Sequence, residues 1–338
     1  MRKKLLLAMS LCILAPAVNA HHGFTAHFDP DLLIRIEGTI KQYDFINPHS
    51  YLHIESVNDA GETVVYVCDL QAKTQLMRRG ADETLFKVGE PIVVEGFQAR
   101  RNPLRCEFGM GHFADGSSFT MRSTDKARTQ FAENKEIPFS PGSSRSIFGT
   151  WIRPGMDGDL SGRGRRAGMD SITAAGQAAA DAYDPETDHP AAHCRPGSPV
   201  FSWGKPGLAT QISRDANNIF IYHESMDVTR TVHLDLTEHP SDVSPSEMGH
   251  SIGRFEDGVL TIDTARFEVG NLTGSIQHTD KMTLQERVSI HPESGRLLIE
   301  WTTLDPEYYL EPLTGSQRLQ STTKEIIPYN CIPGSPLE

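Results

Sequence analysis

The sequence predicts an all-β protein with two folded domains. Short runs of alternating apolar and polar residues recur along most of the chain. Turn-forming residues separate these runs, and helical periodicity is confined to two short segments. We divide the 338 residues into a signal peptide at 1–20, a five-stranded barrel domain at 21–122, a linker with one short helix at 123–200 and a second β-domain at 201–335.

The first twenty residues are predicted to be a secretory signal peptide. A basic start, Arg2-Lys3-Lys4, precedes an apolar stretch at 5–18, and Val18-Asn19-Ala20 fits a small-residue cleavage site. The apolar stretch is shorter than the ~20 residues that a bilayer span needs, and no later segment comes close. We therefore expect a periplasmic or secreted protein without membrane insertion, whose mature chain starts at His21.

Composition narrows the classes of partner. The full chain carries a formal net charge of −12, and cleavage would remove the three basic residues of the signal. Nucleic acids and anionic membrane surfaces bind basic faces, so we expect neither as a partner. The acidity is compatible with cations and with neutral small molecules.

The sequence of the first domain contains five runs of alternating apolar and polar residues, with one short helical segment between the third and the fourth. We expect strands at 34–41, 52–55, 64–70, 92–96 and 105–122, and a helix at 71–79 that Gly80 ends. Three strands, a helix and two further strands is the order of an OB-fold barrel. The expected fold of 21–122 is therefore an OB-like five-stranded barrel.

The second domain is predicted to be built from hairpins. A loose stretch rich in proline, glycine and serine precedes it, with one alanine-rich helix at 173–183. The expected strands cover 209–215, 219–224, 228–235, 250–256, 259–267, 282–291, 296–304 and 318–327. Asp257-Gly258 is the strongest hairpin sequence among the turns. The prediction is an antiparallel eight-stranded β-barrel, lipocalin-like, or a sandwich.

Four cysteines remain after cleavage, and an even number in an exported chain predicts two disulfides. The third and fifth strands of an OB-fold are neighbours, so Cys68 is expected to pair with Cys106. Cys194 and Cys331 bracket the second domain, and a bond between them would join its two ends. None of the spacings resembles a CxxC metal site.

Histidines near the expected mature terminus form a candidate copper site. The α-amino group and ring of His21, with His22 or His49 as a further donor, would give the nitrogen ligands that copper prefers. His27 belongs to the same group. In the alternative interpretation these are incidental histidines of a mobile terminus, and His49 orients the Asn47-Pro48 turn.

Four polar side chains of the second domain form a candidate ligand-binding set. Arg230, His250, Arg254 and Glu286 share strand parity with apolar residues, so we expect them inside the barrel. Because buried charges need partners, Arg254 and Glu286 are predicted to belong to one buried network. Such a network either fixes the barrel structurally or anchors a small molecule in a cavity.

Two parts of the chain resemble exported bacterial proteins of unassigned function. The N-terminal resemblance covers about 20–122 and depends on His21-His22-Gly23-Phe24, His27-Phe28-Asp29, Glu37-Gly38-Thr39, Asn47-Pro48-His49, residues 76–80 and Val88-Gly89-Glu90. The C-terminal part looks like an uncharacterised exported β-domain through residues 249–256, 260–264, Glu286-Arg287 and Asp305-Pro306. That pattern usually carries tryptophan and Gly-Asp where this chain has Phe255 and Asp257-Gly258. The resemblance implies exported β-rich domains, and it brings neither a catalytic residue set nor a cofactor.

The leading interpretation is an exported, non-enzymatic binding protein. Its partner would be a small molecule in the C-terminal barrel or a metal at the N-terminus. One alternative is a copper-dependent oxidase or monooxygenase that uses an N-terminal histidine brace. Another is an adaptor or structural protein of the envelope, which would bind a second envelope protein.

Overall fold

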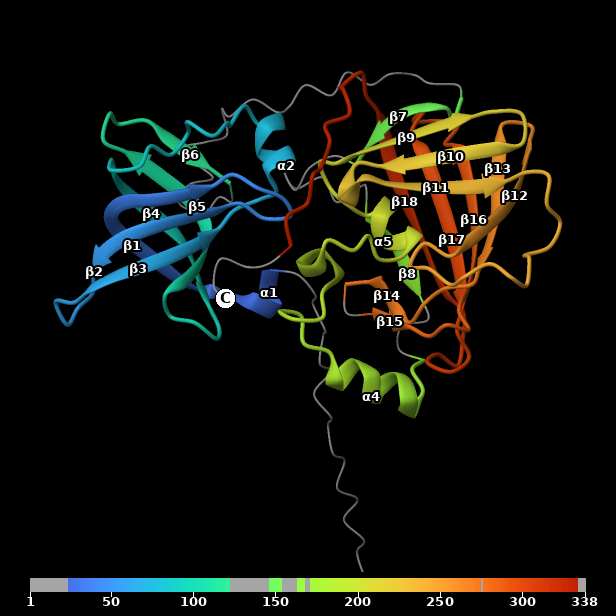
Figure 1. Ribbon diagram of the computed structural model, residues 1–338, viewed down its shortest axis with the longest axis horizontal. Coiled ribbons are helices and arrows are strands. Elements are labelled where there is room, and N and C mark those ends of the chain that lie inside the picture. Colours follow the sequence, from blue (N-terminus) through green and yellow to red (C-terminus); the bar gives the residue numbers. More distant parts are fainter. Residues whose placement is uncertain (1–23, 122–145, 154–162, 168–170, 275, 334–338) are drawn as a thin grey trace, which may run out of the picture.

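The structure is a computed structural model that describes residues 24–121, 146–153, 163–167, 171–274 and 276–333. It is mostly β, with a curved sheet near the N-terminus and a closed barrel near the C-terminus. In Figure 1 the N-terminal strands, coloured blue to green, stand beside the barrel, whose strands are mostly yellow to red. The prediction of a β-rich protein with a C-terminal barrel is confirmed.

The N-terminal unit is a six-stranded sheet with a short helix. Its elements are α1 (Phe24–His27), β1 (Phe28–Asp44), β2 (Tyr51–Val57), β3 (Thr63–Asp69), α2 (Lys73–Arg78), β4 (Pro91–Ala99), β5 (Arg105–Phe113) and β6 (Ser118–Thr120). The strand order is β3-β2-β1-β4-β5-β6, and β3 also pairs with β5 in parallel. The strand expected at 105–122 is divided in two, because the chain turns at Gly116, which has a φ of +84°.

Apolar side chains at alternate strand positions meet inside this unit. Ile36, Ile40, Leu52 and Ile54 are buried against Leu76 of α2. The exposed positions between them carry charged side chains, which is the pattern of a half-buried strand. The core of the N-terminal unit therefore follows directly from the period of two in its sequence.

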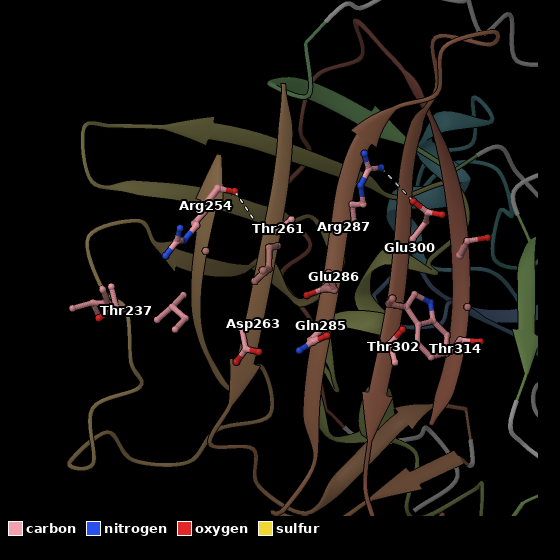
Figure 2. A pocket seen from close by; sticks show the side chains of 17 residues that line it. Thr237, Arg254, Thr261, Asp263, Gln285, Glu286, Arg287, Glu300, Thr302 and Thr314 are labelled. Atoms are coloured by element: carbon pink, nitrogen blue, oxygen red, sulfur yellow. Dashed lines mark hydrogen bonds and ion pairs between the residues drawn. The ribbon is translucent and has the colours of Figure 1, made fainter. Parts of the chain in front are cut away.

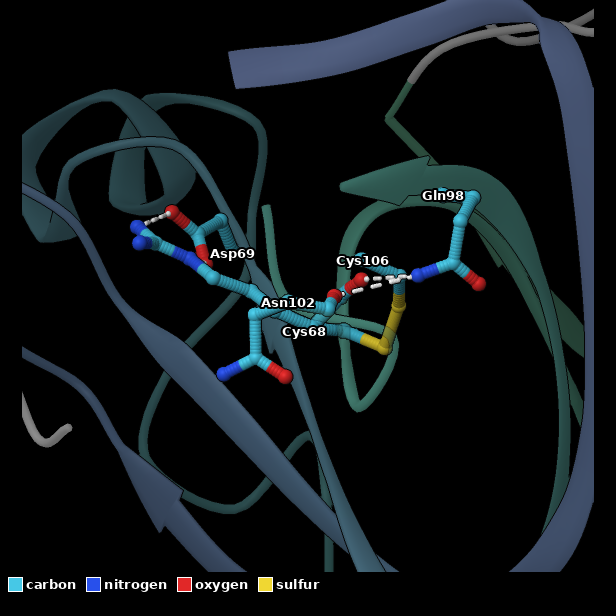
Figure 3. The surroundings of a disulfide bond; sticks show 6 residues. Cys68, Asp69, Gln98, Asn102 and Cys106 are labelled. Atoms are coloured by element: carbon cyan, nitrogen blue, oxygen red, sulfur yellow. Dashed lines mark hydrogen bonds and ion pairs between the residues drawn. A yellow bond between two sulfur atoms is a disulfide. The ribbon is translucent and has the colours of Figure 1, made fainter. Parts of the chain in front are cut away.

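The first predicted disulfide joins β3 to β5. Cys68 and Cys106 lie opposite each other in the parallel pair, with their Cα atoms 4.4 Å apart. Figure 3 shows Gln98 beside this bond, where its Nε2 donates to the backbone oxygens of Asn102 and Arg105. The disulfide thus covalently crosslinks two strands that already share a ladder.

The C-terminal unit is a closed nine-stranded barrel with one extra strand. The barrel order is β17-β16-β13-β12-β11-β10-β9-β7-β18, and β18 pairs back to β17. The strands are β7 (Gly149–Ile152), β9 (Ala209–Arg214), β10 (Asn218–His223), β11 (Val228–His233), β12 (His250–Glu256), β13 (Val259–Ala265), β16 (Thr283–Ile290), β17 (Leu297–Leu304) and β18 (Leu313–Ser321). The extra strand β8 (Arg163–Ala167) pairs with β18, and a small hairpin joins β14 (Gly270–Thr273) to β15 (Ile276–His278).

Three details of the predicted barrel are wrong. It has nine strands and not eight, because β7, a four-residue strand in the stretch expected to be a linker, bridges β9 and β18. The pair β11–β12 is parallel and only two register pairs long, whereas the prediction was fully antiparallel. The last strand begins at Leu313 and ends at Ser321, because the chain then leaves the barrel toward the N-terminal unit.

Two helices pack against the small hairpin of β14 and β15. The predicted helix is present as α4 (Ala174–Ala182), and the side chain of its N-cap, Thr173, accepts a hydrogen bond from Gly176. The short helix α5 (Pro199–Trp203) is buried along its whole length and was not predicted.

The second predicted disulfide, Cys194–Cys331, is also present, with a Cα separation of 5.7 Å. No helix in the described part of the chain is long and apolar enough to cross a membrane.

A buried ion pair holds the two units together. The guanidinium of Arg78, at the end of α2, donates to both carboxylate oxygens of Glu224 in the barrel, with Nη1 2.6 Å from Oε2. The Glu224 side chain is fully buried and also accepts from the backbone N–H groups of Ala209 and Ile327. Glu224 therefore connects α2, the start of β9 and the C-terminal segment.

We predict that Arg78→Ala lowers the free energy of unfolding by about 3–5 kcal/mol, because it leaves the buried Glu224 carboxylate without its counter-charge. Urea unfolding followed by circular dichroism measures the change. Lys281→Ala is the matched control, because Lys281 also pairs with a glutamate, Glu307, but both side chains are exposed. A loss for Arg78→Ala no larger than for the control would contradict the proposed role of this pair.

Candidate functional site

A polar layer crosses the middle of the barrel between two apolar clusters. Its centre is an ion pair between Arg230 of β11 and Glu286 of β16, whose side chains are 1% and 0% exposed. Arg230 also donates from Nε to Ser251 Oγ at 2.8 Å and from Nη2 to Thr264 Oγ1 at 2.6 Å. Trp203 of α5 donates from Nε1 to Glu286 Oε1 at 2.8 Å. The polar layer thus links α5 to four barrel strands.

The predicted partnership of Arg254 with Glu286 is wrong. Arg254 is exposed on the outer face of β12, and the inward positions of that strand are occupied by Ser251 and Gly253. Beside β12 the barrel interior is occupied by the Arg230 side chain, which donates hydrogen bonds to the hydroxyl groups of Ser251 and Thr264. A Cβ on Gly253 would lie 2.6 Å from the backbone oxygen of Thr261 and 2.7 Å from Val232 Cγ1, so any other residue would require the backbone to shift. Small and polar inward residues, and not Arg254, accommodate the buried charge.

His223 is a second buried polar residue of this layer. Its Nδ1 lies 3.0 Å from Thr210 Oγ1, while its Nε2 has no hydrogen-bond partner among the described residues. Its ring packs edge-on against Trp203. Burial, reinforced by the charge of Arg230, lowers the pKa of His223 to about 3. His223 is therefore neutral across the physiological pH range.

The seam between β11 and β12 opens into a cavity of about 530 Å³. The two parallel strands pair only at Val232↔Ser251 and His233↔Ile252, so their earlier residues are not joined by a ladder. The cavity, which we call the seam cavity, is lined by Arg195, Pro196, residues 228–231, His233, residues 246–251 and Glu268. Arg230 is among the lining residues, and its Nη1 has no hydrogen-bond partner in the described part of the chain.

Three histidines meet at the rim of the seam cavity. His250 stacks on His233 with ring centroids 5.0 Å apart, and its Nδ1 lies 2.8 Å from Nδ1 of His239. The Nε2 atom of His239 is 2.8 Å from Oδ1 of Asp263. Of these residues the sequence predicted only His250, and it expected that side chain inside the barrel rather than at the rim.

A shallow groove of about 670 Å³ lies on the outer face of the barrel (Figure 2). Outward side chains of β12, β13, β16, β17 and β18 form its floor, and the segment at 236–237 forms one side. Arg254 projects from β12, and Arg287 makes an exposed ion pair with Glu300 at 3.4 Å. The structure thus divides the predicted ligand set in two: Arg230 and His250 line the seam cavity, whereas Arg254 and Glu286 line the outer groove. The carboxylate of Glu286 is nevertheless buried in its ion pair with Arg230.

The predicted copper site is described only in part. His21 and His22 lie outside the described residues, whereas His49 Nδ1 is 3.1 Å from the backbone oxygen of Leu70. The Asn47-Pro48 turn is held by Asn47, whose side chain bonds Thr74 of α2, and not by His49. Within the described residues, no group of three or more histidine, cysteine, aspartate or glutamate side chains is arranged to hold a metal ion.

His27 and His49 nevertheless share a neighbourhood with residues from the barrel side. Burial lowers the pKa of His189 to about 3, and Lys205, His49 and His27 lower it further in that order. Burial also lowers the pKa of Lys205 to about 7, and its Nζ lies 3.5 Å from the Phe201 ring centroid. His27 and His49 thus both act electrostatically on His189. The pKa of His49 is itself lowered, mainly by burial, and Lys205 contributes to lowering it as it does for His189.

We predict that Glu286→Ala lowers the free energy of unfolding by about 3–5 kcal/mol, because Arg230 would keep its charge in the barrel core without a partner. Arg254→Ala is the matched control on the same barrel, and it should leave the unfolding midpoint unchanged because Arg254 is exposed. Chemical denaturation of both variants decides between the observed pairing and the one expected from sequence. A large loss for Arg254→Ala would contradict the structure.

The depressed pKa of His223 predicts acid lability. Between pH 6.5 and 3 the unfolded chain binds a proton at this residue that the folded protein does not bind, so stability falls as pH falls. One such proton changes the free energy of unfolding by up to about 1.4 kcal/mol per pH unit. Denaturant unfolding of His223→Gln across this range should show a shallower slope than the wild type. The exposed His193→Gln serves as the control, and an unchanged slope for His223→Gln would reject the assignment.

Comparison with known proteins supports the N-terminal resemblance and adds no activity. Residues 9–105 match the model of a family of unknown function, DUF6152. The match includes β1 to β4 and α2, and it ends at the start of β5. No curated protein matches the chain. The N-terminal part is therefore similar to a domain of unknown function.

Proposed function

We propose that this chain is an exported, non-enzymatic binding protein that holds a small molecule in the seam cavity. The observation that carries the proposal is the buried guanidinium of Arg230, whose unpartnered Nη1 belongs to a residue lining that cavity. An unpaired buried donor costs free energy, so an acceptor oxygen supplied by a ligand would be stabilising. The volume of about 530 Å³ lies in the range of small-molecule sites.

The charges around the cavity suggest the class of ligand. Glu286 already neutralises Arg230, and Arg195 makes ion pairs with Glu247 at 2.8 Å and Glu268 at 3.1 Å. The cavity therefore has no excess of positive charge that would favour a polyanion. Because Arg195 faces two carboxylates and Arg230 faces one, these side chains together carry a net charge of −1, and a neutral molecule with a carbonyl oxygen fits this environment best.

Two further features support an exported protein of this architecture. Both disulfides suit an oxidising compartment outside the cytoplasm. The N-terminal unit is proposed to be an OB-fold, because β1 pairs with β2 and β4, and β3 pairs with β2 and, in parallel, with β5. The lipocalin-like comparison extends only to the closed barrel, since β11 and β12 are parallel.

A copper site at the N-terminus remains our second candidate. It would use His21 and His22, and the observation that favours it is the buried Nδ1 of His27, which has no hydrogen-bond partner among the described residues. A copper-dependent oxidase or monooxygenase would require this site. An envelope adaptor is the third candidate, and the outer groove is the surface that would meet its partner.

Blocking the seam cavity tests the leading proposal. Thr231→Trp places an indole in the cavity from β11, and Thr302→Trp places the same side chain in the outer groove as the matched control. The probes are butyrate, lactate and benzoate, each compared with its amide. At a hundred times its Kd, a bound probe stabilises the folded protein by about 2.7 kcal/mol.

We expect at least one probe to raise the Tm of the wild type and of Thr302→Trp, but not that of Thr231→Trp. Differential scanning fluorimetry measures the shift. If none of the six compounds stabilises the wild type, or if Thr231→Trp responds as strongly, the seam cavity is not a site for this class of molecule.

A further inference from the structure

The rim histidines bring two ring nitrogens into direct contact. His239 belongs to the segment between β11 and β12, and His250 is the first residue of β12. Their Nδ1 atoms are 2.8 Å apart, with the rings nearly perpendicular at 80°. In the absence of a metal, one nitrogen must carry a proton and the other a lone pair for this contact to be attractive.

Asp263 determines which nitrogen has the lone pair. Its Oδ1 is 2.8 Å from Nε2 of His239, and a carboxylate only accepts, so Nε2 carries the proton. In neutral His239 the lone pair is then on Nδ1, the atom that faces His250. A histidine whose other nitrogen donates to a carboxylate is the usual arrangement around a metal ligand, because it fixes the ring and raises its basicity.

We propose that His239 and His250 chelate a divalent copper or nickel ion through their Nδ1 atoms. Metal–nitrogen bonds of about 2.0 Å and donors 2.8 Å apart give a nitrogen–metal–nitrogen angle of about 90°. That angle belongs to tetragonal copper(II) and square-planar nickel(II), and it is smaller than the tetrahedral angle that structural zinc adopts. Binding requires the bridging proton of His250 to move from Nδ1 to Nε2 through solvent. Both rings must also turn, so that their Nδ1 lone pairs converge on an ion that lies beside the line joining the two nitrogens.

The surroundings are compatible with such a site. The His239 side chain is 16% exposed and that of Asp263 45% exposed, so an ion from solution reaches the pair. His233 stacks on His250 with an interplanar angle of 15°, which supports the ring from one side. No preformed group of three ligands exists among the described residues, so water or a molecule in the seam cavity would complete the coordination. The proposal does not depend on what occupies that cavity.

Titration of copper(II) into the mature protein tests the chelate, with isothermal calorimetry for stoichiometry and electron paramagnetic resonance for the ligands. We expect His239→Gln and His250→Gln each to lose one equivalent of copper relative to the wild type. His53→Gln is the matched control, because His53 also pairs with an aspartate, Asp44, at 2.8 Å, but within the described ranges its ring contacts no second imidazole. Asp263→Asn should weaken this copper site by about 10–100-fold.

The same titration separates this site from copper at the N-terminus. A form with one additional N-terminal residue keeps both rim histidines, so it should retain the equivalent that His239→Gln loses. Thermal unfolding without copper confirms that the variants are folded. Equal stoichiometry and affinity for the wild type, His239→Gln and His250→Gln would overturn the proposal and leave the contact as a hydrogen bond between two imidazoles.

Discussion

The buried ion pair between Arg230 and Glu286 is the constraint on which the barrel interior depends. Removing two charges from water is costly, and hydroxyl and indole groups offset this cost by bonding Nε and Nη2 of Arg230 and Oε1 of Glu286, while Nη1 of Arg230 has no partner among the described residues. Those partners come from α5, β12 and β13, so the pair determines which residues of these elements face inward. The apolar clusters on either side then fill the two halves of the barrel.

The short parallel pairing of β11 and β12 determines the structure at the surface of the barrel beside Arg230. Because β11 and β12 share only two register pairs, the wall beside Arg230 is not sealed by backbone hydrogen bonds. The long connection between these two strands also places His239 opposite His250. One irregularity of the ladder therefore creates both the seam cavity and the histidine pair at its rim.

The junction between the units is specific rather than incidental. Arg78 reaches Glu224, Gln75 donates to the backbone oxygen of Pro206 at 2.7 Å, and the backbone N–H of Ile332 donates to Asn47 at 2.9 Å. These contacts involve α2, the turn before it and the C-terminal segment, whose Cys331 is also bonded to Cys194. The junction thus orders a stretch of chain that contains no helix or strand of its own.

The sequence by itself determined most strands, one hairpin and both disulfides, because these depend on residues that are close together in the chain or on the order of the strands. Alternation with a period of two located most strands, Asp257-Gly258 gave a hairpin with positive φ at both residues, and the order of strands and cysteines predicted both disulfides. Only tertiary structure decided which face of β12 points inward. Ser251 and Ile252 lie on opposite faces, and the face with Ser251 points inward because its hydroxyl accepts a hydrogen bond from the buried Arg230. Tertiary structure alone brought His239 and Asp263 to His250, since residues on separate segments have no spacing that the sequence could reveal.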